Sequence, residues 1–127
     1  MPKILVVDDE NDYHKLLKII LKPEGYSVIS AYDGQEGIEK IYKEKPDLVI
    51  LDINMPKMSG WEVCNEIRKD QKLAYIPILM LTVRSKQEEQ IRGLQIGSDD
   101  YMTKPFNPDR LVTRVNAIIR RVKAMKK

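Results

Sequence analysis

The strongest constraint on the fold is an alternation repeated five times along the chain, in which a short apolar run precedes a segment with helical spacing. The runs occupy residues 4–7, 28–31, 48–51 and 78–81, with a weaker fifth at 101–102. Three of the four clear runs are nearly continuous in Val, Ile and Leu, which is typical of strands covered on both faces. The run at 28–31 is more mixed and indicates an edge strand. This order predicts a parallel sheet with crossover helices.

The segments between the runs carry apolar residues at the spacing of one helix face. These are Tyr13, Leu16, Leu17 and Ile20 in the first, Ile38, Ile41 and Tyr42 in the second, Val63 and Ile67 in the third, and Leu111, Val115, Ile118, Ile119 and Val122 in the last. A capping box at residues 85–88 predicts the start of a fourth helix. Asn107 as cap and Pro108 at the first helical position predict a fifth helix over about 108–124, with a basic tail to 127.

We therefore predict one α/β domain over residues 1–127. Its fold is doubly wound (βα)5 and flavodoxin-like, with a five-stranded parallel sheet in the order 2-1-3-4-5 and helices on both faces. A length of 127 residues with 43% apolar residues is enough for one continuous core. Gly25, Gly60 and Gly97 fall where turns are needed.

Composition excludes several classes of protein. The 22 basic and 19 acidic residues are too evenly balanced to indicate binding of nucleic acid or an acidic membrane, and the basic tail has no interleaved aromatic residues. The single Cys64 is interpreted as a small packing residue in a reducing compartment. Without a signal peptide or a membrane-spanning run, we expect a cytoplasmic protein. His14 lies off the apolar stripe and is interpreted as a surface histidine.

Polar side chains follow four of the five predicted strands. Asp8 and Asp9 follow the first, Asp52 follows the third, Thr82 ends the fourth and Lys104 follows the fifth. In a doubly wound sheet these ends meet at one edge, where ligands bind. Singly, each residue has an alternative as loop acid, helix cap or surface charge. Together, carboxylates ~4 Å apart repel by about 4 kcal/mol at an effective dielectric near 20, which favours a bound divalent cation.

The expected ion is Mg²⁺, because the site offers hard carboxylate oxygens and no cluster of His or Cys. An acidic pocket holding Mg²⁺, with Lys104 and the Thr82 hydroxyl directed at the same place, has the components of phosphoryl transfer. Of the carboxylates, only Asp52 lies at the point where the strand order reverses and is also central enough to act as the nucleophile.

Four motifs, in this order, resemble the receiver domains of response regulators in bacterial two-component signalling. They are ILVVDDE at 4–10, DLVILDINMP at 47–56 followed by Ser59 and Gly60, IPI at 76–78 continuing to Thr82, and GSDDYMTKPF at 97–106. The resemblance extends from Lys3 to about Val122. Four motifs on a consistent βα scaffold make it highly specific.

The resemblance implies a Mg²⁺-dependent switch that assists its own phosphorylation and dephosphorylation and is not a turnover enzyme. It assigns these roles: Asp52 as phosphoacceptor, Asp9 as a direct metal ligand, Asp8 as a ligand through water, the Asn54 carbonyl as a third ligand, Lys104 as a phosphoryl contact, Thr82 as the hydroxyl that moves to the phosphoryl group, and Tyr101 as the aromatic that turns inward behind it. It also implies a cis peptide bond between Lys104 and Pro105.

Positions at the mouth of the pocket depart from the commonest pattern of the family. Val83 stands where many members carry Ala or Gly, and Arg84 and Asn54 lie beside the same opening. We hypothesise that these three residues tune the access of water or small donors to the phosphoryl group, and hence its lifetime.

The resemblance implies a histidine kinase or phosphotransfer protein as donor, and an output domain or protein that binds the fourth helix, fifth strand and fifth helix. Residues 111–115 and 120–121 resemble receivers joined to winged-helix DNA-binding domains, which often dimerise through ion pairs on this face. Here Arg110 faces the same side as Arg92, so one of the expected ion pairs would be like-charged. An ion pair between Arg114 and Asp99 or Asp100 remains possible. We expect a monomer or a weak phosphorylation-dependent dimer.

Two other classes stay open. A flavin-binding electron carrier could share the fold, but it would need a phosphate loop rich in Ser, Thr and Gly where this chain has Asp8, Asp9 and Glu10. A phosphatase with an aspartyl nucleophile usually needs a second Asp two residues later, and Asn54 occupies that position.

Overall fold

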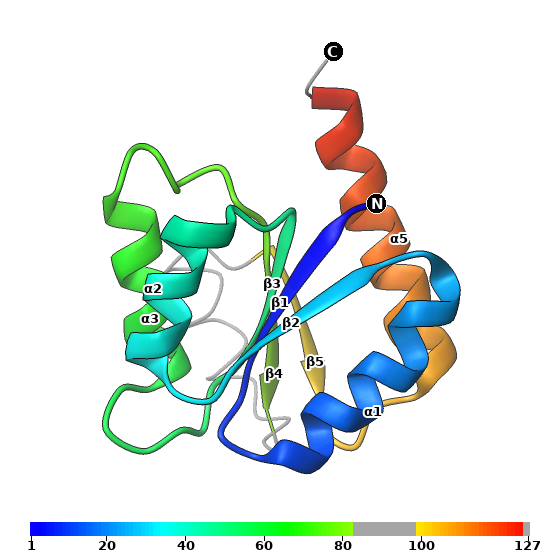
Figure 1. The fold of residues 1–127 in the computed structure, drawn as a ribbon, viewed down its shortest axis with the longest axis horizontal. Helices are drawn as coiled ribbons and strands as arrows, with labels where there is room; N and C mark the ends of the chain where they lie inside the picture. Colours follow the sequence, from blue (N-terminus) through cyan, green and yellow to red (C-terminus); the bar gives the residue numbers. More distant parts are fainter. Residues whose placement is uncertain (83–98, 126–127) are drawn as a thin grey trace.

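The computed structural model describes residues 1–82 and 99–125. In this part of the chain five parallel strands form one sheet in the order β2-β1-β3-β4-β5 (Figure 1). They are β1 (Lys3–Val7), β2 (Ser27–Ala31), β3 (Leu48–Asp52), β4 (Ile78–Thr82) and β5 (Asp100–Thr103). The predicted strand order and the doubly wound class are confirmed.

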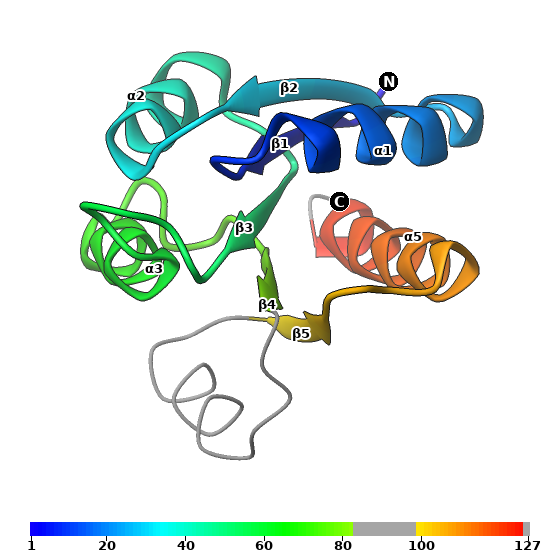
Figure 2. The ribbon, with the colours of Figure 1, turned by 90° about the horizontal axis from the view of Figure 1, so that it is seen from below.

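Helices cover both faces of the sheet, in two layers that Figure 2 shows end-on. The helices α1 (Asn11–Leu21) and α5 (Pro108–Met125) pack on one face, and α2 (Gly34–Glu44) and α3 (Gly60–Lys69) on the other. A short 3₁₀ helix, η1 (Lys22–Glu24), leads to Gly25, whose φ of 93° is a left-handed conformation that suits glycine. The predicted fourth helix at residues 85–88 lies outside the described residues.

The core is divided by the sheet into two apolar clusters. One joins alternate strand residues to α2 and α3 through Ile41, Val63 and Ile67. The other joins the remaining strand residues to α1 and α5 through Leu17 and Leu111. Every residue of β3 and β4 is buried, as expected for central strands, whereas four of the five β2 residues are only partly buried. The mixed run at 28–31 is therefore the edge strand that its composition predicts.

Local side-chain contacts fix where the helices begin. The Asn107 side-chain oxygen Oδ1 accepts from the backbone N–H groups of Asp109 at 2.9 Å and Arg110 at 3.2 Å, which confirms the predicted cap of α5. Ser59 caps α3 in the same way through Glu62 N–H. At Gly60 an added Cβ would lie 2.8 Å from Ile53 Cα, so only glycine fits where α3 starts beside the end of β3.

Three residues differ from the sequence prediction. His14 is 1% exposed, so its interpretation as a surface histidine is wrong. Leu16 and Tyr42, expected on buried helix faces, are 40% and 49% exposed. The buried face of α1 is instead formed by His14, Leu17 and Leu21. The Tyr42 hydroxyl lies outside the core and donates to the Asp70 carboxylate.

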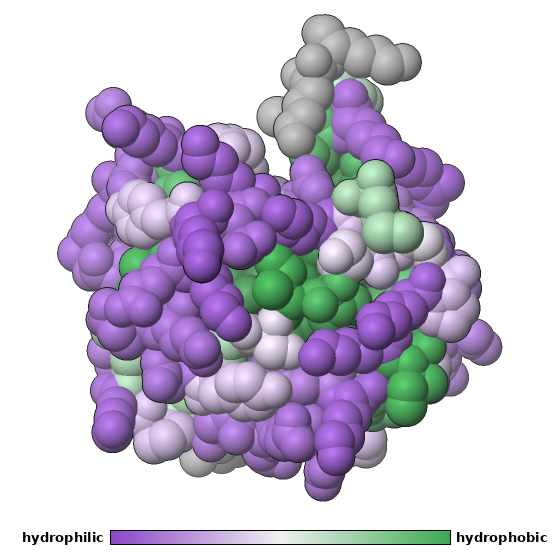
Figure 3. All heavy atoms as spheres, in the orientation of Figure 1, coloured by the Kyte–Doolittle hydropathy of each residue, from purple (hydrophilic) through white to green (hydrophobic). Residues whose placement is uncertain are grey.

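The outer edge of β2 carries backbone groups that no strand of the described sheet pairs. Ala31 O accepts from Asp8 N–H and so faces β1, which turns the backbone groups of neighbouring Ser30 outward. The Lys40 ammonium of α2 donates to Ser30 O, and Glu36 Oε1 accepts from Tyr32 N–H at 2.6 Å. Helix α2 thus satisfies part of the exposed edge. Figure 3 shows apolar surface over the same strand, between the two helical layers.

Candidate functional site

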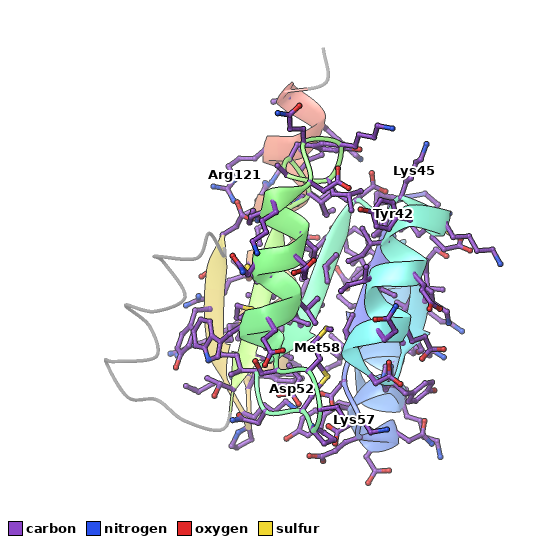
Figure 4. The ribbon with its side chains drawn as sticks, turned by 90° about the vertical axis from the view of Figure 1, so that its left-hand side faces the viewer. Tyr42, Lys45, Asp52, Lys57, Met58 and Arg121 are labelled. Atoms are coloured by element: carbon purple, nitrogen blue, oxygen red, sulfur yellow. The ribbon has the colours of Figure 1, made fainter. Side chains whose placement is uncertain are left out.

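The three predicted carboxylates, Thr82 and Lys104 lie together at the carboxyl edge of the sheet. Asp52 ends β3 and pairs in register with Leu81, one residue before Thr82 at the end of β4. Thr82 in turn pairs with Thr103, the residue before Lys104. Figure 4 shows Asp52 at this end of the sheet, beside the loop that carries Lys57 and Met58. Parallel register therefore brings together side chains that are far apart in sequence.

Lys104 is the centre of this group. Its Nζ lies 2.8 Å from Asp8 Oδ2 and 3.3 Å from Asp52 Oδ1. The exposed fractions of Asp8, Asp52 and Lys104 are 1%, 3% and 6%. Charges buried this deeply need partners, because transfer of an unpaired charge out of water is strongly unfavourable. The peptide bond between Lys104 and Pro105 is cis, as the resemblance implies.

The two acids after β1 differ in their surroundings. Asp8 Oδ1 accepts from Glu10 N–H at 2.9 Å, and the backbone carbonyl of Asp8 lies 2.7 Å from His14 Nε2. Asp9 is exposed to solvent. Oxygens of Asp8, Asp9 and Asp52 lie within 4.8 Å of one another, close enough to share one cation. Their hard oxygen donors match Mg²⁺, and no His or Cys joins them in this cluster.

Burial raises the pKa of Asp52 to about 6, and the negative charge of Asp8 adds to the effect, whereas Lys104 opposes it. For Lys104, burial alone would lower the pKa, but the hydrogen bond that its ammonium group donates to Asp8 and the charges of Asp52 and Asp8 raise the pKa above its usual value. One ammonium group therefore leaves the carboxylates incompletely neutralised. This donor set is therefore suited to an additional cation.

The two predicted switch residues differ in their contacts. Thr82 is fully buried and its Oγ1 donates to the Asn54 side-chain oxygen at 3.2 Å, while Asn54 N–H donates to Asp52 Oδ1 at 3.3 Å. Tyr101 is half-buried and packs against the cluster on the α2 and α3 face. Val83 and Arg84, predicted to tune access, lie outside the described residues.

The sequence prediction missed two contacts of α1 with the site. His14 meets the Asp8 backbone, and the Tyr13 ring faces Lys104 with 3.8 Å between Nζ and the ring centroid. A spacing of three and four residues at His14, Leu17 and Leu21 was the available signal for the buried histidine. For the Tyr13 contact the sequence holds no local signal, because its partner is 91 residues away.

Comparison with known proteins decides the family. A family model of the response regulator receiver domain matches residues 4–116. The chain belongs to this family. It is a receiver domain of two-component signalling, and receiver domains are phosphoacceptor switches.

Individual relatives agree with the family model. Over 119 residues the chain is 51% identical to the alkaline phosphatase synthesis transcriptional regulatory protein PhoP of Bacillus subtilis strain 168. That match covers 94% of this chain but 49% of the relative, so the chain spans about half the relative's length.

Solved structures give the same fold. The Vibrio cholerae chemotaxis protein CheY4 is 35% identical with a TM-score of 0.87, covering 93% of this chain and 98% of that one. The receiver domain of a putative Luxo repressor protein from Vibrio parahaemolyticus is 30% identical with a TM-score of 0.92, covering 98% and 95%. Among the described residues, no helix combines the length and apolarity needed to cross a membrane.

Proposed function

We propose that this receiver domain is a Mg²⁺-dependent switch that accepts a phosphoryl group on Asp52 from a histidine kinase, a phosphotransfer protein or a small phosphodonor. The observation that carries the proposal is the position of the Asp52 carboxylate, buried at the end of β3, 3.3 Å from Lys104 and within one cluster with Asp8 and Asp9.

Asp52 is the best nucleophile of the three acids. Asp8 already binds Glu10 N–H through one oxygen and Lys104 through the other, and Asp9 is exposed. In the transfer, an Asp52 oxygen attacks phosphorus in line, and the bond from phosphorus to the nitrogen or oxygen of the donor breaks with its electron pair leaving on the donor. Lys104 is placed to neutralise negative charge on the phosphoryl oxygens.

The metal-binding residues would be Asp8, Asp9, Asp52 and the backbone carbonyl of Asn54. When bound, Mg²⁺ supplies positive charge that offsets the crowded carboxylates and the phosphoryl oxygens. Asp9 and Asp52 would hold the ion through carboxylate oxygens and Asp8 would hold it through a water, so that Lys104 would share the neutralisation of Asp52 with the ion. The structure supports this assignment through the three converging carboxylates and the raised pKa of Asp52.

Phosphorylation would act on the output surface through Thr82. The Thr82 hydroxyl, now bonded to Asn54, would turn to a phosphoryl oxygen, and Tyr101 would move further into the space behind it. The partner surface would be the fourth helix, β5 and α5. On this surface Arg114 pairs with Asp100 of its own chain at 2.6 Å, and Asp99 pairs with Arg68 at 2.8 Å.

These internal pairs bear on assembly. Since both predicted acids already have intrachain partners, a dimer through Arg114 would have to exchange an existing ion pair, which supports a monomer or a weak phosphorylation-dependent dimer. Residues 1–127 would form one receiver unit, whose output in a longer protein would resemble that of the transcriptional regulator matched above.

Access to the phosphoryl group would be tuned by Asn54, Val83 and Arg84. If the bulk of Val83 restricts water, Val83→Ala shortens the lifetime of the phosphorylated protein. The lifetime is measured by intact mass after the donor is removed, and an unchanged decay rate would contradict the proposal.

The direct test of the function is incubation with Mg²⁺ and acetyl phosphate, followed by intact-mass measurement. We expect wild type to gain one phosphoryl group, Asp52→Asn to gain none, and Asp12→Asn, which removes an exposed acid of α1, to behave as wild type. Phosphorylation of Asp52→Asn to the same extent as wild type would overturn the assignment.

A further inference from the structure

Lys104 has a third neighbour, which the site roles above leave unused. Besides the carboxylates of Asp8 and Asp52, its ammonium group meets the face of the Tyr13 ring, with 3.8 Å between Nζ and the ring centroid. The Lys104 side chain is 2% exposed, so water hardly competes for the ammonium group. Cation–π attraction is strongest at such desolvated positions.

We propose that Tyr13 is a positioning residue for phosphoryl transfer, whose ring face keeps the Lys104 ammonium beside Asp52. The inference rests on the proposed function, because it gives Tyr13 a role in that reaction.

The ring matters because Asp8 serves two purposes. Asp8 lies closer to the Lys104 ammonium than Asp52 does, at 2.8 Å against 3.3 Å, and it is also one of the three acids that converge as a cation site. A divalent cation and Lys104 compete for this carboxylate. The Tyr13 ring does not belong to the acidic cluster and stays available to the lysine. The Tyr13 ring therefore keeps the Lys104 ammonium in the pocket when the Asp8 carboxylate interacts with another cation.

Tyr13 is held firmly enough for this role. Its backbone N–H donates to Glu10 O at 3.2 Å in the first turn of α1, and Leu17 and Leu21 anchor that helix in the core. The Tyr13 ring also meets Phe106, with centroids 6.2 Å apart at 46°. Since Phe106 follows Lys104 by two residues, the loop after β5 supplies both the cation and a second ring contact for Tyr13.

A purely packing role is the competing explanation. Tyr13 is half-buried, and with Leu16 and Phe106 it lines a surface hollow that a protein phosphodonor could contact. A protein donor would therefore mix docking with chemistry. A small donor such as acetyl phosphate cannot use the hollow as a docking surface, so it isolates the effect on Lys104.

The experiment compares wild type, Tyr13→Phe and Tyr13→Leu, with Leu16→Asn as a control in the same hollow. Phosphorylation rate constants are measured by intact mass at saturating Mg²⁺ and acetyl phosphate. We expect Tyr13→Leu to be about tenfold slower, within the range that a desolvated cation–π contact allows, and Tyr13→Phe to keep the rate because it keeps the ring. Leu16→Asn should match wild type.

A second readout reports the contact itself, without phosphorylation or metal. In the NMR spectrum of the metal-free protein, the ring current of Tyr13 should shift the ε-methylene protons of Lys104 upfield in wild type and Tyr13→Phe, but not in Tyr13→Leu. Thermal unfolding checks that Tyr13→Leu is folded, and Tyr13→Met replaces it if it is not.

The outcomes separate the two proposals. Wild type that gains no phosphoryl group overturns the proposed function, and the positioning role falls with it. Normal phosphorylation of wild type with an equal rate in folded Tyr13→Leu overturns the role of Tyr13 alone, as does a rate in Tyr13→Phe as low as in Tyr13→Leu. Lys104 ε-methylene signals that are the same in wild type and Tyr13→Leu overturn the contact.

Discussion

Replacing Asp52 by Asn should change how the stability of the metal-free protein depends on pH. Burial, with the nearby charge of Asp8, raises the pKa of Asp52 from 3.8 to about 6. The folded protein therefore keeps this proton at pH values where the unfolded chain has lost it. The stability that Asp52 contributes is fully present below the unfolded pKa of 3.8 and is lost as the pH rises through about 6.

The magnitude follows from the two pKa values. At about 1.36 kcal/mol per pKa unit, the difference between 3.8 and about 6 amounts to about 3 kcal/mol. Asn has nearly the same shape but does not ionise. The free energy of unfolding of Asp52→Asn, minus that of wild type, should thus grow by about 3 kcal/mol between about pH 4 and about pH 7.5.

Urea unfolding in the presence of a chelator measures this difference at a series of pH values. The Asp12→Asn variant, which removes an exposed acid of α1, is the control. Adding Mg²⁺ at the upper pH should restore stability to wild type more than to Asp52→Asn, since the ion offsets the charge that the variant lacks. A difference that stays constant over the whole pH range would refute the view of Asp52 as a buried, incompletely neutralised carboxylate.

Three further variants test other parts of the structure. Lys104→Met leaves the buried Asp8 and Asp52 without their cation, so the metal-free protein should lose about 3–5 kcal/mol near neutral pH in urea unfolding, and an unchanged midpoint would contradict the buried ion pairs. Asn107→Ala removes the cap of α5 and should lower the free energy of unfolding by about 1 kcal/mol, whereas Thr113→Ala on the exposed side of α5 serves as its comparison. Gly60→Ala forces a Cβ to within 2.8 Å of Ile53 Cα and should lower the melting temperature measured by circular dichroism, and a variant as stable as wild type would show that the loop after β3 can yield.

Much of the fold follows from local patterns. The apolar runs of β3 and β4 are continuous, whereas the run of β2 is mixed. This contrast predicts that β3 and β4 are central strands and that β2 lies at the edge. Once the strand order is known, Asp52, Thr82 and Lys104 must meet, because parallel register brings the carboxyl ends of neighbouring strands to one edge. The convergence of the site could therefore be predicted before any coordinates.

Other features depend on tertiary contacts, for which sequence periodicity is at most a partial signal. His14 reads as polar and surface-exposed, yet its ring is buried, with Nε2 at the Asp8 carbonyl and the ring 4.3 Å from that of Tyr32. Tyr42 reads as an apolar helix residue, but its hydroxyl finds Asp70 beyond the core. Both residues are amphipathic, so their burial is decided by a tertiary hydrogen-bond partner and not by hydrophobicity alone.

The pair Glu36 and Lys40 has a consequence for how copies of this protein avoid one another. An open sheet edge is a template onto which a foreign strand can add, and such addition can propagate into fibrils. Because the two side chains already bond Ser30 O and Tyr32 N–H, an incoming strand cannot form hydrogen bonds with these two groups at the carboxyl end of β2. They also place opposite charges there, 3.7 Å apart, which an approaching apolar strand would have to desolvate. Helix α2, which follows β2 directly in the sequence, thus disfavours self-association through the open edge of that strand.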